Sequence, residues 1–181
     1  MVDKSFGRYQ IEEMSRRVFA VLRTVVVGCL FVSIWVWFLP RYAVGALAFA
    51  DARPAGWIVT FCGAVVSAAC MWEFAWRGIG TPAPWDAPRR LVVSGLYRWV
   101  RNPMYLGLEL MLAGEAITFP HLTRMLLWLM AAFWAAVTVQ IVFYEEPRLR
   151  RTFGAAYEEY CRQVRRWVPR SSPFDKVVGV S

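Results

Sequence analysis

Four runs of apolar residues alternate with polar segments along the chain, over residues 18–39, 56–76, 104–119 and 125–144. A helix needs about 20 apolar residues to cross a hydrocarbon core about 30 Å thick, so the first, second and fourth runs are long enough. The third has about 16 residues, or roughly 24 Å of helix, and crosses only where the bilayer thins or the hairpin tip lies below the surface. The pattern predicts four membrane helices, the last two forming a tight hairpin at residues 120–124.

The segment before the first run differs from the rest of the chain. Residues 1–17 carry charges of both signs and lack the basic n-region and small-residue cleavage site of a signal peptide. We expect them to form an interfacial helix on the membrane surface, followed by one membrane domain over residues 18–181. The predicted fold class is therefore all-α and polytopic, with the sequence motifs confined to residues 76–170.

The composition favours a lipid environment. Hydrophobic residues make up 58% of the chain, ten residues are Trp, and the mean hydropathy is +0.38. A soluble domain is usually about 45–50% apolar, and one of 181 residues could not bury this excess. A separate nucleotide-binding α/β domain of about 150 residues is also excluded, because most of the chain is assigned to the bilayer.

The net charge of +8 is distributed unevenly. Lys and Arg number four in residues 1–17, two in 40–55, five in 77–103, one in 120–124 and eight in 145–181. This alternation predicts four spans with both termini in the cytoplasm, in the inner membrane if the protein is bacterial. Orientation and attraction to anionic lipid explain the charge better than nucleic-acid binding, because no basic stretch resembles a nucleic-acid module.

Cysteine and histidine usage limits the chemistry. Three of the four cysteines lie in predicted spans, and they have no CxxC spacing: Cys29, Cys62, Cys70 and Cys161. We expect them to pack as small apolar residues. The single histidine, His121, falls in the outer hairpin tip, so we expect no histidine-based metal site and no Ser-His-Asp triad. Arg, Glu, Tyr, Asn, the backbone or a cofactor must supply the chemistry.

The first polar segment with candidate chemistry runs from residue 77 to 107. Gly78 and Gly80 precede several prolines, in a segment where the backbone can approach a ligand closely; a helix C-cap followed by a turn is the alternative. Asn102 and Pro103 suit the N-cap and first position of the third membrane helix. The free amides there favour a carboxylate or a phosphate.

The second such segment begins where the fourth membrane helix ends, at Glu145 and Glu146. Two adjacent carboxylates at a membrane boundary need a cation or hydroxyl donors, unless they are solvated or paired with Arg148 or Arg150. Both segments emerge on the same side of the membrane. We therefore expect the two glutamates to face residues 97–105 across a pocket at the cytoplasmic interface.

Two further carboxylates, Glu109 and Glu115, lie within the third predicted membrane helix. Each would cost roughly 2.5–3.5 kcal/mol if exposed to lipid at the bilayer centre, so both should face the helix bundle. Glu109 is nearer the cytoplasmic end and is the better candidate to line an acceptor pocket.

In chain order, the motifs are GLYRWVRNPMYLG at residues 95–107, Glu145-Glu146, Phe153-Gly154, Tyr157 and Tyr160. This ordered set resembles the isoprenylcysteine carboxyl methyltransferase and phospholipid (phosphatidylethanolamine) N-methyltransferase superfamily. The resemblance covers about residues 76–170. It implies an integral-membrane enzyme that uses S-adenosyl-L-methionine to methylate a lipophilic acceptor, either a phospholipid amine or an isoprenylcysteine-like carboxylate, at the cytoplasmic interface.

The same resemblance implies which residues form the site. Positions that bind the cofactor in the carboxyl methyltransferases match Leu91, Val92, Tyr97, Asn102, Pro103, Met104, Tyr105 and Glu145. The GxG and paired-glutamate elements of the phospholipid N-methyltransferases match Gly78, Gly80, Glu145 and Glu146. The chemistry agrees, because glutamates accept hydrogen bonds from hydroxyl or ammonium groups and aromatic faces attract a sulfonium or stack on adenine.

As catalytic candidates we take Arg101 and Glu146. Arg101 suits an acidic group such as a lipid phosphate, although an interfacial arginine that only orients the protein is an equal alternative. Two departures from the family pattern matter. Asn102 stands where many members have His and cannot titrate, and Ile141 stands where the isoprenylcysteine enzymes have an arginine near their acceptor. The second departure favours a phospholipid amine.

A small thiol S-methyltransferase and a non-catalytic membrane subunit or small transport protein are the alternative functions, although a scaffold has no need of the paired glutamates and the complete loop. A sterol-reductase-like protein that binds a dinucleotide is disfavoured by the short chain and by the presence of only four predicted spans. The motifs do not identify the acceptor atom as nitrogen, oxygen or sulfur. Besides a lipid-like substrate from the bilayer, a second copy of the chain is a candidate partner, through pairing of the first helices.

Overall fold

The computed structural model describes residues 14, 15, 18, 19, 22, 26, 42, 52–74, 76 and 91–175. Most of the predicted interfacial helix (1–17) and of the first predicted span (18–39) lies outside these residues. So do Gly78 and Gly80.

All elements of the described chain are helical, as expected for an all-α protein. From residue 52 onward, the described residues form the α-helices α3 (Pro54–Glu73), α4 (Pro103–Thr118), α5 (Thr123–Gln140) and α6 (Glu146–Gln163). Shorter turns join them: η4 (Gly95–Arg98), η5 (Pro120–Leu122) and the π-helical turn η6 (Ile141–Glu145). The α4 helix has 16 residues, the length expected of the third predicted membrane helix.

Two of the described helical stretches are long and apolar enough to cross a membrane. They are Pro54–Glu73 and Pro120–Gln163, and the second includes α5. Large apolar side chains are exposed along α3 and α5, among them Ile58, Phe61, Leu127 and Trp128. Such exposure is costly in water and favourable in lipid, so it agrees with membrane helices. The total of four spans stays a prediction.

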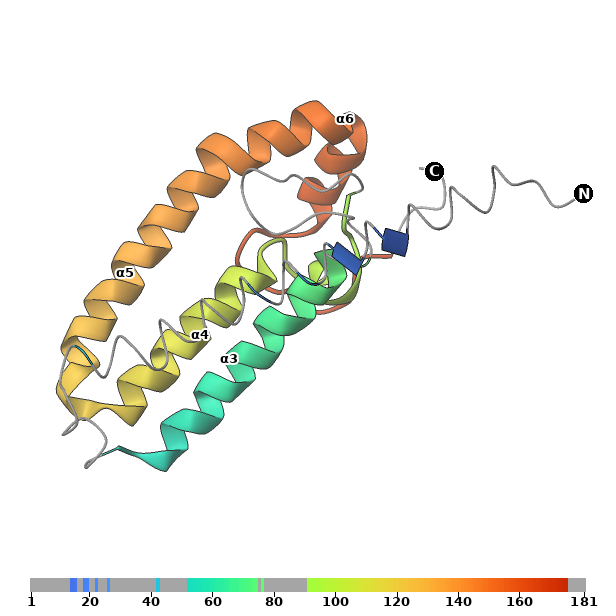
Figure 1. Ribbon diagram of the computed structural model, residues 1–181. Coiled ribbons are helices and arrows are strands. Elements are labelled where there is room, and N and C mark those ends of the chain that lie inside the picture. Colours follow the sequence, from blue (N-terminus) through green and yellow to red (C-terminus); the bar gives the residue numbers. More distant parts are fainter. Residues whose placement is uncertain are drawn as a thin grey trace, which may run out of the picture.

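The α4 helix lies between α3 and α5 and runs antiparallel to both (Figure 1). At one end of the bundle the Arg53 amide donates to the Thr118 carbonyl at 2.9 Å, which joins the start of α3 to the end of α4. At the opposite end, the last turn of α3 lies next to η4, and Tyr105 in the first turn of α4 is hydrogen-bonded to Gln140 of α5 and to Glu145 of η6. We call this end the site end.

Small residues bring the α3 and α4 backbones into close contact. The buried residues of α3 recur every three or four positions: Gly56, Thr60, Gly63, Ser67 and Cys70. They face Gly107, Met111, Gly114 and Thr118 of α4. A Cβ atom on Gly63 would lie 2.6 Å from the Gly107 carbonyl oxygen, and one on Gly114 would lie 2.4 Å from the Thr60 nitrogen. Small faces of this kind allow close association of membrane helices without a hydrophobic driving force.

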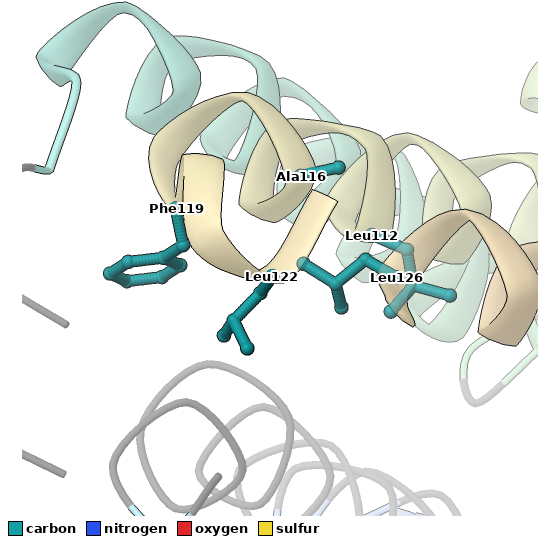
Figure 2. Close-up of a cluster of buried hydrophobic side chains, with 5 residues drawn as sticks. All are labelled: Leu112, Ala116, Phe119, Leu122 and Leu126. Atoms are coloured by element: carbon teal, nitrogen blue, oxygen red, sulfur yellow. The ribbon is translucent and has the colours of Figure 1, made fainter. Parts of the chain in front are cut away.

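The hairpin between α4 and α5 is held by a compact apolar cluster (Figure 2), formed by Leu112, Ala116, Phe119, Leu122 and Leu126. The Thr123 hydroxyl donates to the Ala116 carbonyl at 2.7 Å and closes the turn. Beside this cluster the Glu115 side chain is completely buried. The expectation that Glu115 faces the protein interior is confirmed.

Helix α6 changes direction at Gly154, where φ is 50° and ψ is −126° (Figure 1). Only glycine adopts this backbone region readily. The bend turns the second half of α6 back toward the bundle, so that Tyr157 and Tyr160 become buried against Val93 and Val164. The Tyr160 hydroxyl donates to the Tyr97 carbonyl at 2.7 Å.

Replacing Gly63 with Val tests the contact between α3 and α4. The new side chain would meet the Gly107 backbone, which cannot move aside without separating the helices, so we expect a loss of stability of about 3 kcal/mol. Thermal unfolding in detergent measures it. Ala69→Val, on the exposed face of α3, should unfold near the wild-type temperature. Equal unfolding temperatures for the two variants would contradict the close contact.

Gly154→Ala tests the bend in α6. A Cβ atom at Gly154 would have no other atom within 4 Å, so any effect comes from the backbone conformation alone. We expect destabilisation of about 1–3 kcal/mol. Arg151→Ala, at an exposed position with helical backbone, is the control. An unchanged unfolding temperature for Gly154→Ala would show that the bend does not require glycine.

Candidate functional site

The loop before α4 packs against the last turn of α3. Gly95 opens the η4 turn with φ of 54°, as the predicted turn requires, and Ser94 donates its hydroxyl to the Glu73 carboxylate. Tyr97, the buried residue of this turn, packs edge-on against Phe74 with ring centroids 5.3 Å apart. Burial raises the pKa of the Tyr97 phenol well above its usual value, so this side chain stays protonated and cannot serve as a base.

The C-terminal segment that follows α6 covers the other side of this loop. Three backbone hydrogen bonds join the two segments: Arg101 N to Arg165 O at 3.0 Å, Arg170 N to Trp99 O at 2.9 Å, and Phe174 N to Arg98 O at 2.9 Å. The Arg98 guanidinium also donates to the Phe174 carbonyl at 2.8 Å. The loop is therefore fixed between the end of α3 and the C-terminal segment.

Helix α4 begins at Pro103, with Asn102 at the N-cap position, as predicted. The predicted capping role of the Asn102 side chain is wrong, because it makes no cap hydrogen bond. Its amide instead donates to the Arg166 carbonyl at 3.3 Å. The C-terminal segment supplies an acceptor that local sequence could not reveal, since it is 64 residues away in the chain.

Glu146 lies at the centre of a cluster of arginines. Its side chain is only 5% exposed. Arg166 donates through Nε at 2.8 Å and through Nη2 at 3.0 Å, a bidentate pair. Arg101 donates through Nη1 at 3.1 Å, and Arg150 lies farther away at 3.7 Å. The hydrogen bond to Glu146 raises the pKa of the Arg166 guanidinium.

Both sequence-based catalytic candidates thus belong to one cluster, in which three guanidinium groups surround one carboxylate. The Arg101 side chain is 13% exposed and also donates to the Cys161 sulfur at 2.9 Å. Its Nε has no hydrogen-bond partner among the described residues. With Glu158, which also pairs with Arg150, three guanidinium groups share two carboxylates, so the cluster carries one positive charge in excess.

Glu145 has a different environment from its neighbour. Its Oε1 accepts from the Tyr105 hydroxyl at 2.5 Å and from the Gln140 amide at 2.8 Å. The Tyr105 ring packs edge-on against Phe133, with centroids 6.5 Å apart. No described residue donates to Oε2 of Glu145. The two adjacent glutamates therefore face different partners, one an arginine cluster and the other a tyrosine of α4.

Three further residues implied by the resemblance, Leu91, Val92 and Met104, pack in apolar clusters next to the loop. Val92 is buried with Cys70 and Tyr97, and Met104 packs against the same cluster. Leu91 packs against the cluster of Tyr157 and Tyr160. The structure thus brings the described site residues to one end of the bundle. The pocket expected between the two segments stays a prediction.

Two polar residues of the site were missed from the sequence. Arg166 had no local signal, because its partner Glu146 is 20 residues earlier. Gln140 did carry a local signal, because it is a polar amide in a run of apolar residues, five positions before Glu145. A polar side chain within a membrane helix is costly and usually has a partner.

Glu146→Gln tests the arginine cluster. Removing the carboxylate leaves the largely buried Arg101 and the partly exposed Arg166 without their counter-charge, so we expect a loss of about 3 kcal/mol in the free energy of unfolding. Glu158→Gln removes an exposed partner of Arg150 and should cost at most about 1 kcal/mol. Chemical denaturation in detergent measures both. Equal costs would show that Glu146 does not hold the cluster together.

Comparison with known proteins adds a family assignment to this geometry. The family model described as phospholipid methyltransferase matches residues 52–156, more than half of the chain. The match runs from α3 to the middle of α6 and includes the loop, the hairpin and both glutamates. No curated protein and no solved structure gave a significant match. The family implies methyltransferase activity at a membrane. The chain belongs to the phospholipid methyltransferase family, within the isoprenylcysteine/phospholipid methyltransferase superfamily.

Proposed function

We propose that this protein transfers a methyl group from S-adenosyl-L-methionine to a lipophilic acceptor at the cytoplasmic face of a membrane. A phospholipid amine is the favoured acceptor. The observation that carries the proposal is the division between the adjacent glutamates. Glu145 keeps one carboxylate oxygen available, while Glu146 holds an arginine cluster with excess positive charge beside it.

The side chains at the site end fit this cofactor. Its ammonium and ribose hydroxyl groups need acceptors, and Oε2 of Glu145 is one. Its carboxylate suits the free amides of Met104 and Tyr105 in the first turn of α4. Leu91, Val92 and Tyr97 would support the loop around it, and Gly78 and Gly80 would contribute from outside the described residues. When bound, the cofactor supplies an activated methyl group and leaves as a neutral thioether that needs no acid.

Residues near Glu145 suit an acceptor that enters from the lipid. On the membrane side of the polar cluster, Phe133 packs against Tyr105, and Trp134 of α5 packs against Trp167 of the C-terminal segment, with centroids 4.2 Å apart. Aromatic rings at this depth offer an apolar surface for acyl chains and a face for an amine cation. Alignment of the acceptor and exclusion of water would then provide most of the rate enhancement.

The charges near the site favour a phospholipid over a prenylated carboxylate. Ile141 is buried and supplies no cation at the position where the isoprenylcysteine enzymes have an arginine. The arginine cluster, with Arg101 at its inner side, suits the phosphate of a lipid headgroup. In this proposal Arg101 orients the acceptor, and Glu146 acts through Arg101 by fixing its guanidinium. An amine acceptor must lose a proton before transfer, whereas a carboxylate need not.

Calorimetry with S-adenosyl-L-methionine and the purified protein tests the cofactor. We expect wild-type protein to bind it, and Glu145→Gln to weaken the affinity about 10- to 100-fold because a charge-assisted hydrogen bond is lost. Glu159→Gln removes an exposed carboxylate of α6 and serves as the control. Absence of binding to folded wild-type protein would contradict the proposal and favour a non-catalytic role.

Incubation with radiolabelled methyl donor and total membrane lipid then identifies the acceptor. We expect label in an amine-containing phospholipid, established by mass spectrometry of the product. Label in a prenylcysteine peptide or a small thiol, supplied in parallel, would overturn the choice of acceptor but not the class of reaction.

A further inference from the structure

Gln140 occupies an unusual place relative to Glu145. In a regular α-helix, residues five positions apart point about 140° away from each other, because each residue turns about 100°. The turn between these two residues is π-helical, over Ile141–Glu145, and it is wider. It brings the Gln140 amide to 2.8 Å from Glu145 Oε1. Single π-helical turns within α-helices occur frequently at functional sites.

The same amide also approaches Tyr105, whose hydroxyl lies 3.3 Å from Nε2 of Gln140. Gln140, Tyr105 and Glu145 thus form a closed triangle of hydrogen bonds between the end of α5 and the first turns of α4. Both donors use the same carboxylate oxygen. Because Oε1 accepts both hydrogen bonds, the carboxylate is held in one orientation, with Oε2 pointing away from Tyr105 and Gln140.

We infer that Gln140 is a positioning residue that orients the Glu145 carboxylate, so that its free oxygen receives a hydroxyl or ammonium group of the cofactor. The inference rests on the proposed function. The π-helical turn is what permits this contact, since a continuous α-helix would point the Gln140 amide away from Glu145. The inference also gives a reason for an amide at the end of the apolar helix α5, where an unpaired amide would be costly.

Gln140 lies seven residues after Phe133, almost on the same face of α5, and both side chains contact Tyr105. Phe133 contacts the ring of Tyr105 and Gln140 contacts its hydroxyl. One face of α5 therefore fixes both the ring and the hydroxyl group of Tyr105. Gln140 belongs to the polar end of this contact, next to the carboxylate.

A double-mutant cycle measured by calorimetry with S-adenosyl-L-methionine tests the inference. Gln140→Met keeps the length and the helix propensity of the side chain but removes its donor. We expect the dissociation constant to rise about three- to tenfold in the wild-type background and less than twofold in the Glu145→Gln background. The unfolding temperature without cofactor should stay near the wild-type value, which a purely structural role would lower.

Two further variants complete the experiment. Gln140→Glu keeps size and polarity but places a second carboxylate against Glu145, and it should weaken binding at least as much as Gln140→Met. Gln163→Met is the matched control, because Gln163 donates to an exposed glutamate, Glu159, at 2.5 Å, and its loss should leave the affinity unchanged.

The outcomes separate the inference from the proposed function. Wild-type binding with equal losses from Gln140→Met in both backgrounds would overturn the inference alone, because Gln140 would then act independently of Glu145. Unchanged affinity in Gln140→Met or in Gln140→Glu would also overturn it alone. Absence of binding to folded wild-type protein would overturn the proposed function and the inference with it.

Discussion

Glu146 is a nearly buried carboxylate at the end of a membrane helix, and it contacts arginines from two other parts of the chain. Arg101 belongs to the loop before α4, and Arg166 belongs to the segment after α6. A carboxylate in this position would be destabilised without compensating charge. The ion cluster therefore joins the loop, the start of α6 and the C-terminal segment, and backbone hydrogen bonds also join the loop to the C-terminal segment. Whatever binds at the site end meets a surface fixed by this cluster.

The rigid support for that surface comes from a different kind of contact. The α3 and α4 helices pack through glycine and hydroxyl residues, so their backbones approach closely and can slide little relative to one another. The first turn of α4, with Tyr105, is thereby held at a set distance from the end of α3. The π-helical turn at the end of α5 directs Glu145 toward Tyr105.

Sequence reasoning succeeded where the signal was local or periodic. The apolar runs predicted the positions of α3, α4 and α5 within a few residues, Pro103 marked the start of α4, and Gly95 marked a turn. It failed for the partners of polar side chains. Asn102 suited an N-cap, but its side-chain amide donates to the carbonyl of Arg166, which is distant in the chain. Arg166 and Glu146 lie on either side of the bend at Gly154, and no pattern of hydrophobic positions predicts which arginine reaches the carboxylate.

The two adjacent glutamates show why a motif alone does not assign roles. In the sequence they are equivalent, and both suit a cofactor. In the structure the π-helical turn ends at the first of them and α6 begins at the second, so their side chains point to different partners. Glu146 has both oxygens engaged by guanidinium groups, and a ligand would have to displace an arginine to reach them. Glu145 accepts both of its hydrogen bonds on one oxygen. The physical cost of ligand contact is therefore lower at Glu145. This difference supports the proposal that the cofactor contacts the first glutamate, while the second holds the loop and the C-terminal segment together.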